Sequence, residues 1–407
     1  MANKLVDLVE GRERVAMEEI GAQADRAGKV LAKVRSVMLA PNVGKSAPKF
    51  TATQLGTLVN LNTSQIDYRV KKEGSDFPSG SLNAAGNRRE FALSEVRQWC
   101  RGMRAQRMRP EGGEAIVISV ANFKGGVAKT TTAVTLAQGL SIRGHKVLVV
   151  DCDPQGSLTT LFGILPDAEV EAEDTILPLC TGDEMSAEYA IRNTYWDGID
   201  LIPATSALFS AEFTLPSRQK DAVNRKEEFQ FWNVLHYGLE TARQNYDVII
   251  VDTPPSLSYV TINALMAADG LITPLPPNAL DFASSVQFWN LFHDVAGSLS
   301  KQGKPKVYEF IDVLLSKVDS SDAATNVVRE WIGAAYGAKV LPIEIPKTST
   351  AATASAEFGS IYDLKAGTAS SRTIKRAVDA YERLVETIED QVVSAWARQV
   401  SDMESEQ

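Results

Sequence analysis

An apolar run at residues 115–121 leads directly into the sequence ANFKGGVAKTTTAV at residues 121–134. This order predicts a buried strand, a glycine-rich turn and the start of a helix. Lys124 precedes the turn, and Lys129 and Thr130 follow it. Small residues expose backbone N–H groups, the lysine adds a cation and the threonine adds a hydroxyl for Mg²⁺, as phosphate binding requires. A simple nucleotide site gives no role to Lys124.

The loop departs from the strict Walker A pattern, because Ala128 stands where that pattern has glycine. A tight Gly-Gly turn with incidental lysines is the competing interpretation. Two strand-like runs, 146–151 and 247–252, end in Asp151 and Asp252, and Asp153 follows the first. Parallel strands bring their carboxyl ends to one edge of a sheet, so the three segments are expected to meet at one crevice. Together they favour a site for a nucleotide and Mg²⁺.

Strand-like and helix-like segments alternate from residue 115 onward. This alternation predicts an α/β domain of the P-loop NTPase kind, with a doubly wound, mostly parallel sheet. Further strand candidates are 199–203, 270–275, 310–315 and 339–343, and the last long helix is expected to begin near residue 371. Residues 205–230 favour a helix of no assigned role.

The net charge of −9 is unevenly distributed along the 407 residues. Residues 1–110 hold 19 Lys and Arg against 11 Asp and Glu, which gives them +8 and leaves −17 for the remainder. This asymmetry indicates a basic N-terminal part with local affinity for DNA, joined to an acidic domain.

Residues 4–39 are typical of one long helix, because apolar residues recur at three- and four-residue steps until Pro41. Such a helix needs a partner for its apolar stripe. Packing across a dimer is favoured over packing on its own chain, and the broken heptad argues against a long coiled coil.

Residues 50–99 are typical of a winged helix-turn-helix. Thr51 is an N-cap candidate, a second helix begins after Asn62, and a hairpin rich in Gly, Ser and Asn follows. The residues expected to contact DNA are Gln65, Tyr68, Arg69 and Lys72 on the second helix and Arg88 and Arg89 in the wing. A helical docking module with solvated basic residues is the competing interpretation.

Four arginines, at 101, 104, 107 and 109, precede a linker-like Pro-Glu-Gly-Gly sequence. They either contact phosphates or keep the helix end in solution.

The sequence KGGVAKTT at 124–131 resembles the KGGxxKT(T/S) loop of the deviant Walker A ATPases, and among them that of the ParA-type DNA partition proteins. DCDPQGS and DVIIVDTPPSLS are similar to the second motif and the Walker B motif of that family, and residues 274–284 resemble its large subgroup. The resemblance covers about residues 115–395. It implies a homodimer that forms with ATP and is a weak ATP hydrolase until a partner stimulates it.

The resemblance implies catalytic roles for Lys124, Lys129 and Asp153. Lys129 would hold phosphate, Asp153 would orient the attacking water, and Lys124 would reach across the interface to the ATP of the partner. Thr130 would hold Mg²⁺ directly, and Asp252 would hold it through water. The implied ATP-binding residues are Lys124, Gly125, Gly126, Val127, Ala128, Lys129, Thr130 and Thr131 in the loop, with Lys317, Pro346 and Lys347 near adenine.

Arg372, Lys375 and Arg376 form a cationic patch at the start of the last helix. The resemblance implies that this patch binds DNA without sequence preference, through phosphate contacts. A helix with a few solvated basic residues is the other interpretation.

We therefore expect three parts: residues 1–40 for dimerisation, 41–112 as a winged helix-turn-helix domain with its linker, and 113–407 as the ATPase domain. The leading hypothesis is a DNA segregation ATPase of a plasmid or chromosome that binds nucleoid DNA, a specific operator as its own repressor, and a ParB-like centromere-binding partner. The alternative is chiefly a transcriptional or replication regulator with ATP as a structural ligand.

Other classes fit poorly. The first residues lack the apolar segment of a signal peptide, and no apolar run is long enough to cross a bilayer. A membrane-cycling relative would need a basic amphipathic tail, whereas the sequence ends acidic. Three cysteines without paired spacing argue against disulfides and iron–sulfur or zinc sites. We expect a cytoplasmic, nucleoid-associated protein without a membrane partner.

Overall fold

The computed structural model describes residues 15–38, 45–72, 76–83, 85–300, 305–347, 360–363 and 372–406. The chain divides into two compact units, residues 1–46 and residues 47–407. The first contains helix α2 (Met17–Met38), which confirms the predicted long helix from residue 17 onward. Val15 and Ala16, within the predicted range, are described and precede the helix, while residues 4–14 and 39 lie outside the described residues. Met17, Ile20 and Val30 are more than half exposed, and packing of this stripe across a dimer stays a prediction.

The second unit contains an eight-stranded sheet in the order β11-β10-β9-β4-β8-β5-β7-β6. Its strands are β4 (Ile116–Val120), β5 (Val147–Asp151), β6 (Arg192–Asn193), β7 (Ile199–Ile202), β8 (Val248–Asp252), β9 (Gly270–Leu275), β10 (Phe310–Val318) and β11 (Val340–Pro346). Neighbouring strands are parallel, except that β6 runs antiparallel to β7. The predicted doubly wound, mostly parallel α/β fold is confirmed.

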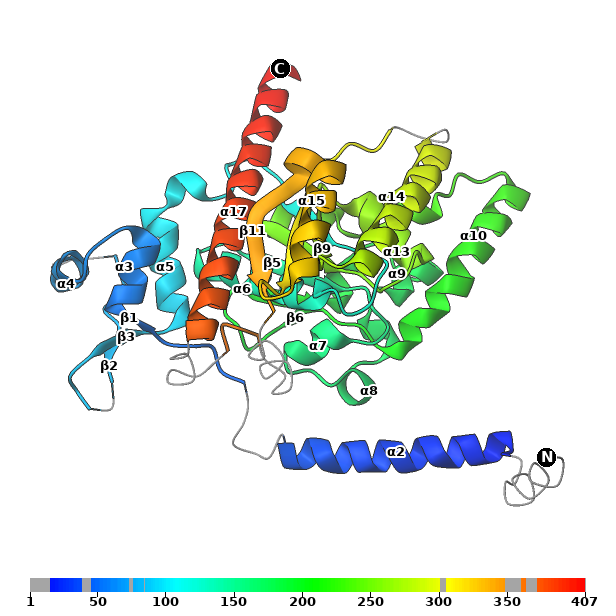
Figure 1. Cartoon of the computed structure of the whole chain (residues 1–407), viewed down its shortest axis with the longest axis horizontal. Helices are drawn as coiled ribbons and strands as arrows, with labels where there is room; N and C mark the ends of the chain where they lie inside the picture. The colour runs from blue at the N-terminus through cyan, green and yellow to red at the C-terminus, as the bar shows by residue number, and fades with distance from the viewer. Residues whose placement is uncertain are drawn as a thin grey trace. The chain divides into compact units, whose positions relative to one another are not determined.

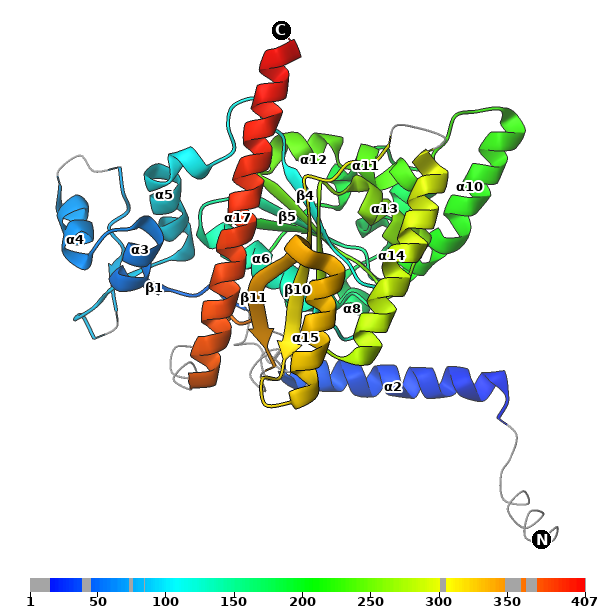
Figure 2. The ribbon, with the colours of Figure 1, turned by 45° about the horizontal axis from the view of Figure 1, so that its top comes forward.

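Helices cover both faces of this sheet (Figures 1 and 2). They are α6 (Lys129–Ile142), α7 (Ser157–Leu161), α8 (Pro166–Glu169), α9 (Leu177–Thr181), α10 (Ala211–Arg225), α11 (Val234–Gly238), α12 (Glu240–Asn245), α13 (Tyr259–Ala267), α14 (Ala279–Ser300), α15 (Ala323–Tyr336) and α17 (Arg372–Glu406). Short 3₁₀ segments are η1 (Ala105–Arg107), η2 (Ala172–Asp174), η3 (Ala187–Ala190), η4 (Ser206–Ser210), η5 (Phe231–Asn233) and η6 (Gly337–Lys339). η4 and α10 confirm the helical prediction for residues 206–225, whereas residues 226–230 are not helical.

Strand β4 shows how the two faces are built. Its successive side chains point to opposite faces. Ile118 belongs to the buried cluster that includes α6 and α17, whereas Val117 belongs to the cluster that includes α11, α12 and α13. Strands covered on both faces are continuous apolar runs, which is why the sequence reveals β4, β5 and β8 so clearly.

The second unit begins with β1 (Phe50–Thr51), α3 (Ala52–Val59), α4 (Thr63–Lys71), β2 (Ser81–Leu82), β3 (Arg89–Phe91) and α5 (Leu93–Met103). The strands form an antiparallel sheet in the order β1-β3-β2. Thr51 and Asn62 cap α3 and α4, each in a reciprocal capping box with the glutamine three residues later. Gly56 permits the tight turn between these helices, because a Cβ there would lie 2.3 Å from the Leu61 carbonyl oxygen. The order of elements is the one expected for residues 50–99, while DNA binding by them stays a prediction.

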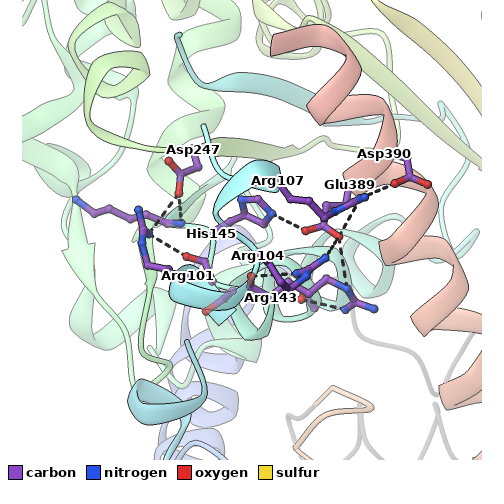
Figure 3. Close-up of polar contacts among 12 residues, drawn as sticks. Arg101, Arg104, Arg107, Arg143, His145, Asp247, Glu389 and Asp390 are labelled. Atoms are coloured by element: carbon purple, nitrogen blue, oxygen red, sulfur yellow. Dashed lines mark hydrogen bonds and ion pairs between the residues drawn. The ribbon is translucent and has the colours of Figure 1, made fainter. Parts of the chain in front are cut away.

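The four arginines at 101, 104, 107 and 109 form ion pairs within the second unit. Figure 3 labels the first three of them beside their carboxylate partners. Arg104 and Arg107 place guanidinium nitrogens 2.6 and 3.3 Å from Glu389 Oε2. Arg101 and Arg109 place theirs 3.6 and 3.4 Å from the Asp247 carboxylate. These contacts add a role that the sequence did not indicate, because the arginines attach the N-terminal part of the unit to the large sheet and its helices.

Glu389 lies at the centre of this joint, and its side chain is fully buried. His145 Nε2 lies 2.8 Å from Glu389 Oε1, and Arg143 Nε lies 3.8 Å from Oε2. Burial by itself raises the pKa of Glu389, but hydrogen bonds and positive charge from His145 and Arg104 outweigh it and lower the pKa to about 2. One carboxylate of α17 therefore joins the segments that follow α5 and α6.

We expect Glu389→Gln to lower the free energy of unfolding by about 3 kcal/mol, because a neutral amide leaves buried arginines without their counter-charge. Urea denaturation at pH 7 measures this, with Glu386→Gln, at an exposed position of the same helix, as the matched control. Since the pKa of Glu389 is lower in the folded chain, its contribution is complete above pH about 4.5 and is lost as the pH falls toward about 2. A wild-type midpoint for Glu389→Gln would contradict this account of the joint.

Candidate nucleotide-binding site

The carboxyl ends of three central strands lie side by side. Val120 of β4 is opposite Asp252 of β8, and Asp252 is opposite Asp151 of β5. The prediction that these three segments meet at one edge of the sheet is therefore confirmed. The loop between β4 and α6 leaves the same edge.

This loop has the backbone conformation that small residues allow. Gly126 and Ala128 have φ angles of 75° and 78°, in the left-handed region. A residue with a Cβ costs roughly 1–2 kcal/mol there, so Ala128 adopts the conformation that glycine would adopt at lower cost. Asn122 secures the start of the loop: its Oδ1 accepts from Lys124 N at 3.0 Å, and its Nδ2 donates to Pro274 O at 2.9 Å.

Lys129, the first residue of α6, is 7% exposed, and its Nζ donates to Lys124 O at 2.9 Å. Burial lowers its pKa, while the negative charges of Asp252 and Asp153 oppose that effect. The ammonium group therefore lies against the loop with two carboxylates nearby. A phosphate group that entered the loop would meet this cation.

Asp252, at the end of β8, is fully buried, and neither carboxylate oxygen has a hydrogen-bond partner in the described part of the chain. Burial and the charge of Asp151 raise its pKa well above the usual range, and Thr130 and Lys129 act in the opposite direction. Unpartnered carboxylate oxygens beside a hydroxyl suit a hard cation such as Mg²⁺. Thr130 and Asp252 thus fit the predicted metal site.

The two aspartates of the DCDPQGS segment have different surroundings. Asp151 is fully buried and accepts hydrogen bonds from Thr159 N and Oγ1 at 2.9 and 2.7 Å, so it holds the turn before α7 in place. Burial raises its pKa to about 6. Asp153 is half-buried, and its Oδ1 accepts from Gln155 N at 3.0 Å. Asp153 is therefore the more accessible of the two, as a water-orienting residue must be.

Lys124 forms an ion pair with Asp281, which lies in α14 after the end of β9. Asp281 is 7% exposed and also accepts a hydrogen bond from Asn278 Nδ2. The stretch 274–284 was noted in the sequence only for its family resemblance, and no role was assigned to Asp281. Within one chain, then, the additional lysine already has an anionic partner.

The residues predicted to lie near adenine are at the ends of β10 and β11, the last two strands at one side of the sheet. Lys317 is exposed and its Nζ donates to Gly126 O at 2.6 Å, so it contacts the loop. Pro346 ends β11 opposite Val318, and Lys347 N donates to Val318 O at 2.9 Å. Lys347 Nζ lies 3.7 Å from Asp319. Pro346 and Lys347 share the carboxyl edge with the loop, and their contact with a base stays a prediction.

The predicted DNA-contacting residues of the N-terminal part differ in availability. Tyr68 is 70% exposed, and Lys72 and Arg88 are also exposed, whereas Arg69 is half-buried. Gln65 Oε1 accepts from Asn62 N at 2.8 Å within the cap of α4. Arg89 donates to Ser79 O and lies 3.9 Å from Asp67, so it ties the hairpin to α4. Tyr68 on α4 and Lys72, which caps its carboxyl end, are thus the most accessible candidates.

Helix α17 begins at Arg372, as the sequence indicated, and Lys375 and Arg376 are exposed on its first turns. The side chain of Arg372 lies outside the described part. No cluster of three or more His, Cys, Asp or Glu suited to a metal occurs among the residues that the structure describes. Across those same residues, no helix is both long and apolar enough to span a membrane.

No role in the site follows from the sequence for Asn122 or Asp281, and the stretch 316–319, with Ser316, is expected near adenine and not at the loop. Asn122 directly precedes the loop, and that position was the available signal. Ser316 is fully buried and its Oγ donates to Val127 O at 2.9 Å, across 189 residues of sequence. No local pattern predicts such a contact.

Comparison with known proteins agrees with this geometry. A family described as an AAA domain matches residues 115–303. A Rhizobium rhizogenes protein named "Putative replication protein A" is 30% identical over 370 residues, which cover 88% of this chain and 90% of that protein. The chromosome partitioning protein ParA of Caulobacter vibrioides is 31% identical over 273 residues, 66% of this chain and 95% of ParA. Protein SopA of Escherichia coli is 36% identical over 235 residues, 57% of this chain and 59% of SopA.

Solved structures share the fold. Cobyrinic acid a,c-diamide synthase of Mycobacterium smegmatis, with bound ADP and magnesium, superposes with a TM-score of 0.52 at 28% identity and covers 67% of this chain and 94% of its own. A structure described as "Partition Protein" has a TM-score of 0.62 and covers 92% of this chain and 98% of its own. At 20% identity the second likeness shows the fold alone.

Asp252→Asn is expected to abolish the gain in ATP affinity that Mg²⁺ provides, because the amide removes the unpartnered anionic oxygens. Titration of ATP in Mg²⁺ and in EDTA measures this gain. The variant and the wild type should bind ATP alike in EDTA and differ by about tenfold or more in Mg²⁺, which corresponds to about 1.4 kcal/mol. Asp294→Asn, at an exposed position of α14, is the control. An unchanged Mg²⁺ effect in Asp252→Asn would remove this residue from the metal site.

Proposed function

Because the chain belongs to the ParA family of DNA partition ATPases, we propose that ATP closes it into a homodimer that segregates plasmid or chromosomal DNA. The family relationship and the P-loop NTPase fold establish ATP, ADP and Mg²⁺ as its ligands. The observation that carries the proposal is the buried Lys129 ammonium, which lies in the loop at the edge where Asp252 and Asp153 supply negative charge. Turnover is slow until a partner stimulates it.

The proposed chemistry is phosphoryl transfer to water by positioning and charge neutralisation. Lys129 and the N–H groups of residues 125–131 bind the phosphates. Asp153 orients the attacking water, and its half-exposed position leaves room for that water. Thr130 and Asp252 hold Mg²⁺, which neutralises charge on the phosphate oxygens when it is bound. Pro346 and Lys347 lie on the side proposed for the base.

Under this proposal, Lys124 of one subunit completes the ATP site of the other subunit. Its ion pair with Asp281 holds it within its own chain, so this pair must open before Lys124 can reach the ATP of a partner. ATP supplies the negative charge that replaces Asp281. Nucleotide binding and dimer formation then depend on each other.

Lys124→Ala is expected to bind ATP within about twofold of the wild type but to lose hydrolysis by roughly 10²–10³, the usual effect of deleting one charge-stabilising group. Equilibrium titration gives binding, and phosphate release in the presence of DNA and a ParB-like protein gives turnover. Lys220→Ala, at an exposed position of α10, is the lysine control. Normal turnover by Lys124→Ala would end the shared-site proposal.

The proposed DNA interactions use two surfaces. The exposed side of α4, with Tyr68 and Lys72, would read the operator of its own gene, and Lys375 and Arg376 at the start of α17 would bind nucleoid DNA without sequence preference. A ParB-like centromere-binding protein would stimulate hydrolysis and release the DNA. In the alternative, a transcriptional or replication regulator, ATP is a structural ligand and the wild-type chain has no ATP turnover that Asp153→Ala could remove.

Charge-reversal variants test the two surfaces in the intact chain. Lys72→Glu should weaken binding to the upstream DNA of its own gene, while random DNA is retained with ATP. Arg376→Glu should weaken binding to random DNA and leave binding to the upstream DNA unchanged. Its binding to random DNA should also depend less on salt concentration, because a phosphate contact is lost. Binding is measured without nucleotide, with ADP and with ATP. Equal loss on both DNAs in both variants would contradict the division into two surfaces.

A further inference from the structure

Two neighbouring residues at the end of β10 hold the nucleotide loop from outside it. Ser316 Oγ donates to Val127 O at 2.9 Å, and Lys317 Nζ donates to Gly126 O at 2.6 Å. Both acceptors are carbonyl groups of consecutive loop residues. β10 is not adjacent to β4, because β9 lies between them in the sheet.

The backbone of β10 explains how adjacent residues reach one loop. Successive side chains of a regular strand point to opposite faces. Lys317 has a φ of 51°, in the left-handed region, and the pairing of β10 with β11 shifts register between Leu315 and Val318. This irregularity turns Lys317 toward the side that Ser316 already faces. A lysine in a sparsely populated conformation of this kind marks a site where function outweighs backbone preference.

The two hydrogen bonds fix the direction of the N–H groups in the loop. In a trans peptide, the C=O and the following N–H point in opposite directions, and the structure contains no cis peptide among its described residues. Fixing Gly126 O therefore fixes Val127 N–H, and fixing Val127 O fixes Ala128 N–H. Neither N–H group meets an acceptor within the described part of the chain. They are left to point away from β10.

We propose that Ser316 and Lys317 are positioning residues that orient the Val127 and Ala128 N–H groups toward the phosphates of the nucleotide. The inference deepens the proposed function, on which it rests for the identity of the ligand. It also changes the expected role of Lys317, from a contact near adenine to a contact that acts through the loop on the phosphates. The contribution of Lys317 to nucleotide affinity is then the same for every base.

The test separates the phosphate role from a base role. Lys317→Met should weaken ATP, ADP and GTP by the same factor, about tenfold, since a hydrogen bond from a charged donor is lost. Its ATP-to-GTP preference should equal that of the wild type. Inorganic tripolyphosphate, which has no base, should also compete for the site about tenfold less well. Because the loop binds substrate and transition state alike, KM should rise while kcat stays within about twofold.

Companion variants complete the experiment. Ser316→Ala should also weaken the binding of nucleotides and tripolyphosphate and raise KM. Lys317→Arg should bind them better than Lys317→Met does, because arginine keeps a cationic donor. Lys339→Met, at an exposed lysine in η6 just before β11, is the matched control. A changed ATP-to-GTP preference, or unchanged tripolyphosphate competition, in Lys317→Met would overturn the proposal. Tripolyphosphate and ADP binding report on the loop even where the chain fails to hydrolyse ATP, so failure of the proposed function is distinguishable.

Discussion

Burial of the Lys129 ammonium group is costly unless polar or negative groups surround it, and the site supplies them from three strands. Lys124 O accepts its hydrogen bond at 2.9 Å, and Asp252 and Asp153 contribute negative charge. Asp252 itself is fully buried without a hydrogen-bond partner among the described residues, so it depends on nearby positive charge in return. The sheet must therefore bring β4, β5 and β8 into register before either charge can be buried. Val120, Asp151 and Asp252 meet in that register.

Helix α6 links this site to the N-terminal part of the second unit. It begins at Lys129, and its 14 residues extend about 21 Å. Just beyond its end, Arg143 and His145 meet Glu389 together with Arg104. The nucleotide site and the joint that holds α3, α4 and α5 thus lie at opposite ends of one helix. This continuity is structural, and an energetic coupling additionally requires that the joint has two arrangements.

Local patterns were sufficient to predict the loop, the strands that end in Asp151 and Asp252, and the caps Thr51 and Asn62. Each of these depends on neighbours in sequence or on the two-residue period of a strand. The contacts of Asp281, Ser316 and Glu389 could not be predicted, because their partners are distant in sequence. Lys124 lies 157 residues from Asp281, and Val127 lies 189 residues from Ser316. Arg104 and His145 lie 285 and 244 residues from Glu389. The arginines at 101–109 illustrate the limit. Their charge suggested DNA or solvent, and only the fold places two buried carboxylates beside them.

The contacts from β10 bear on why alanine is accepted at position 128. Ala128 adopts a left-handed φ of 78°, which a Cβ disfavours, so the loop needs support that a glycine-rich loop could do without. Ser316 and Lys317 supply it by holding the two carbonyls that precede Ala128. The same alanine has fewer conformations than glycine in the unfolded chain, which reduces the entropy lost when the loop is ordered. A loop held in this way is preorganised for phosphate, and its geometry depends on the outer strand whose neighbour, β11, carries Pro346 and Lys347. The phosphate side and the proposed base side of the site are therefore joined through β10, which holds the loop by two hydrogen bonds and pairs with β11.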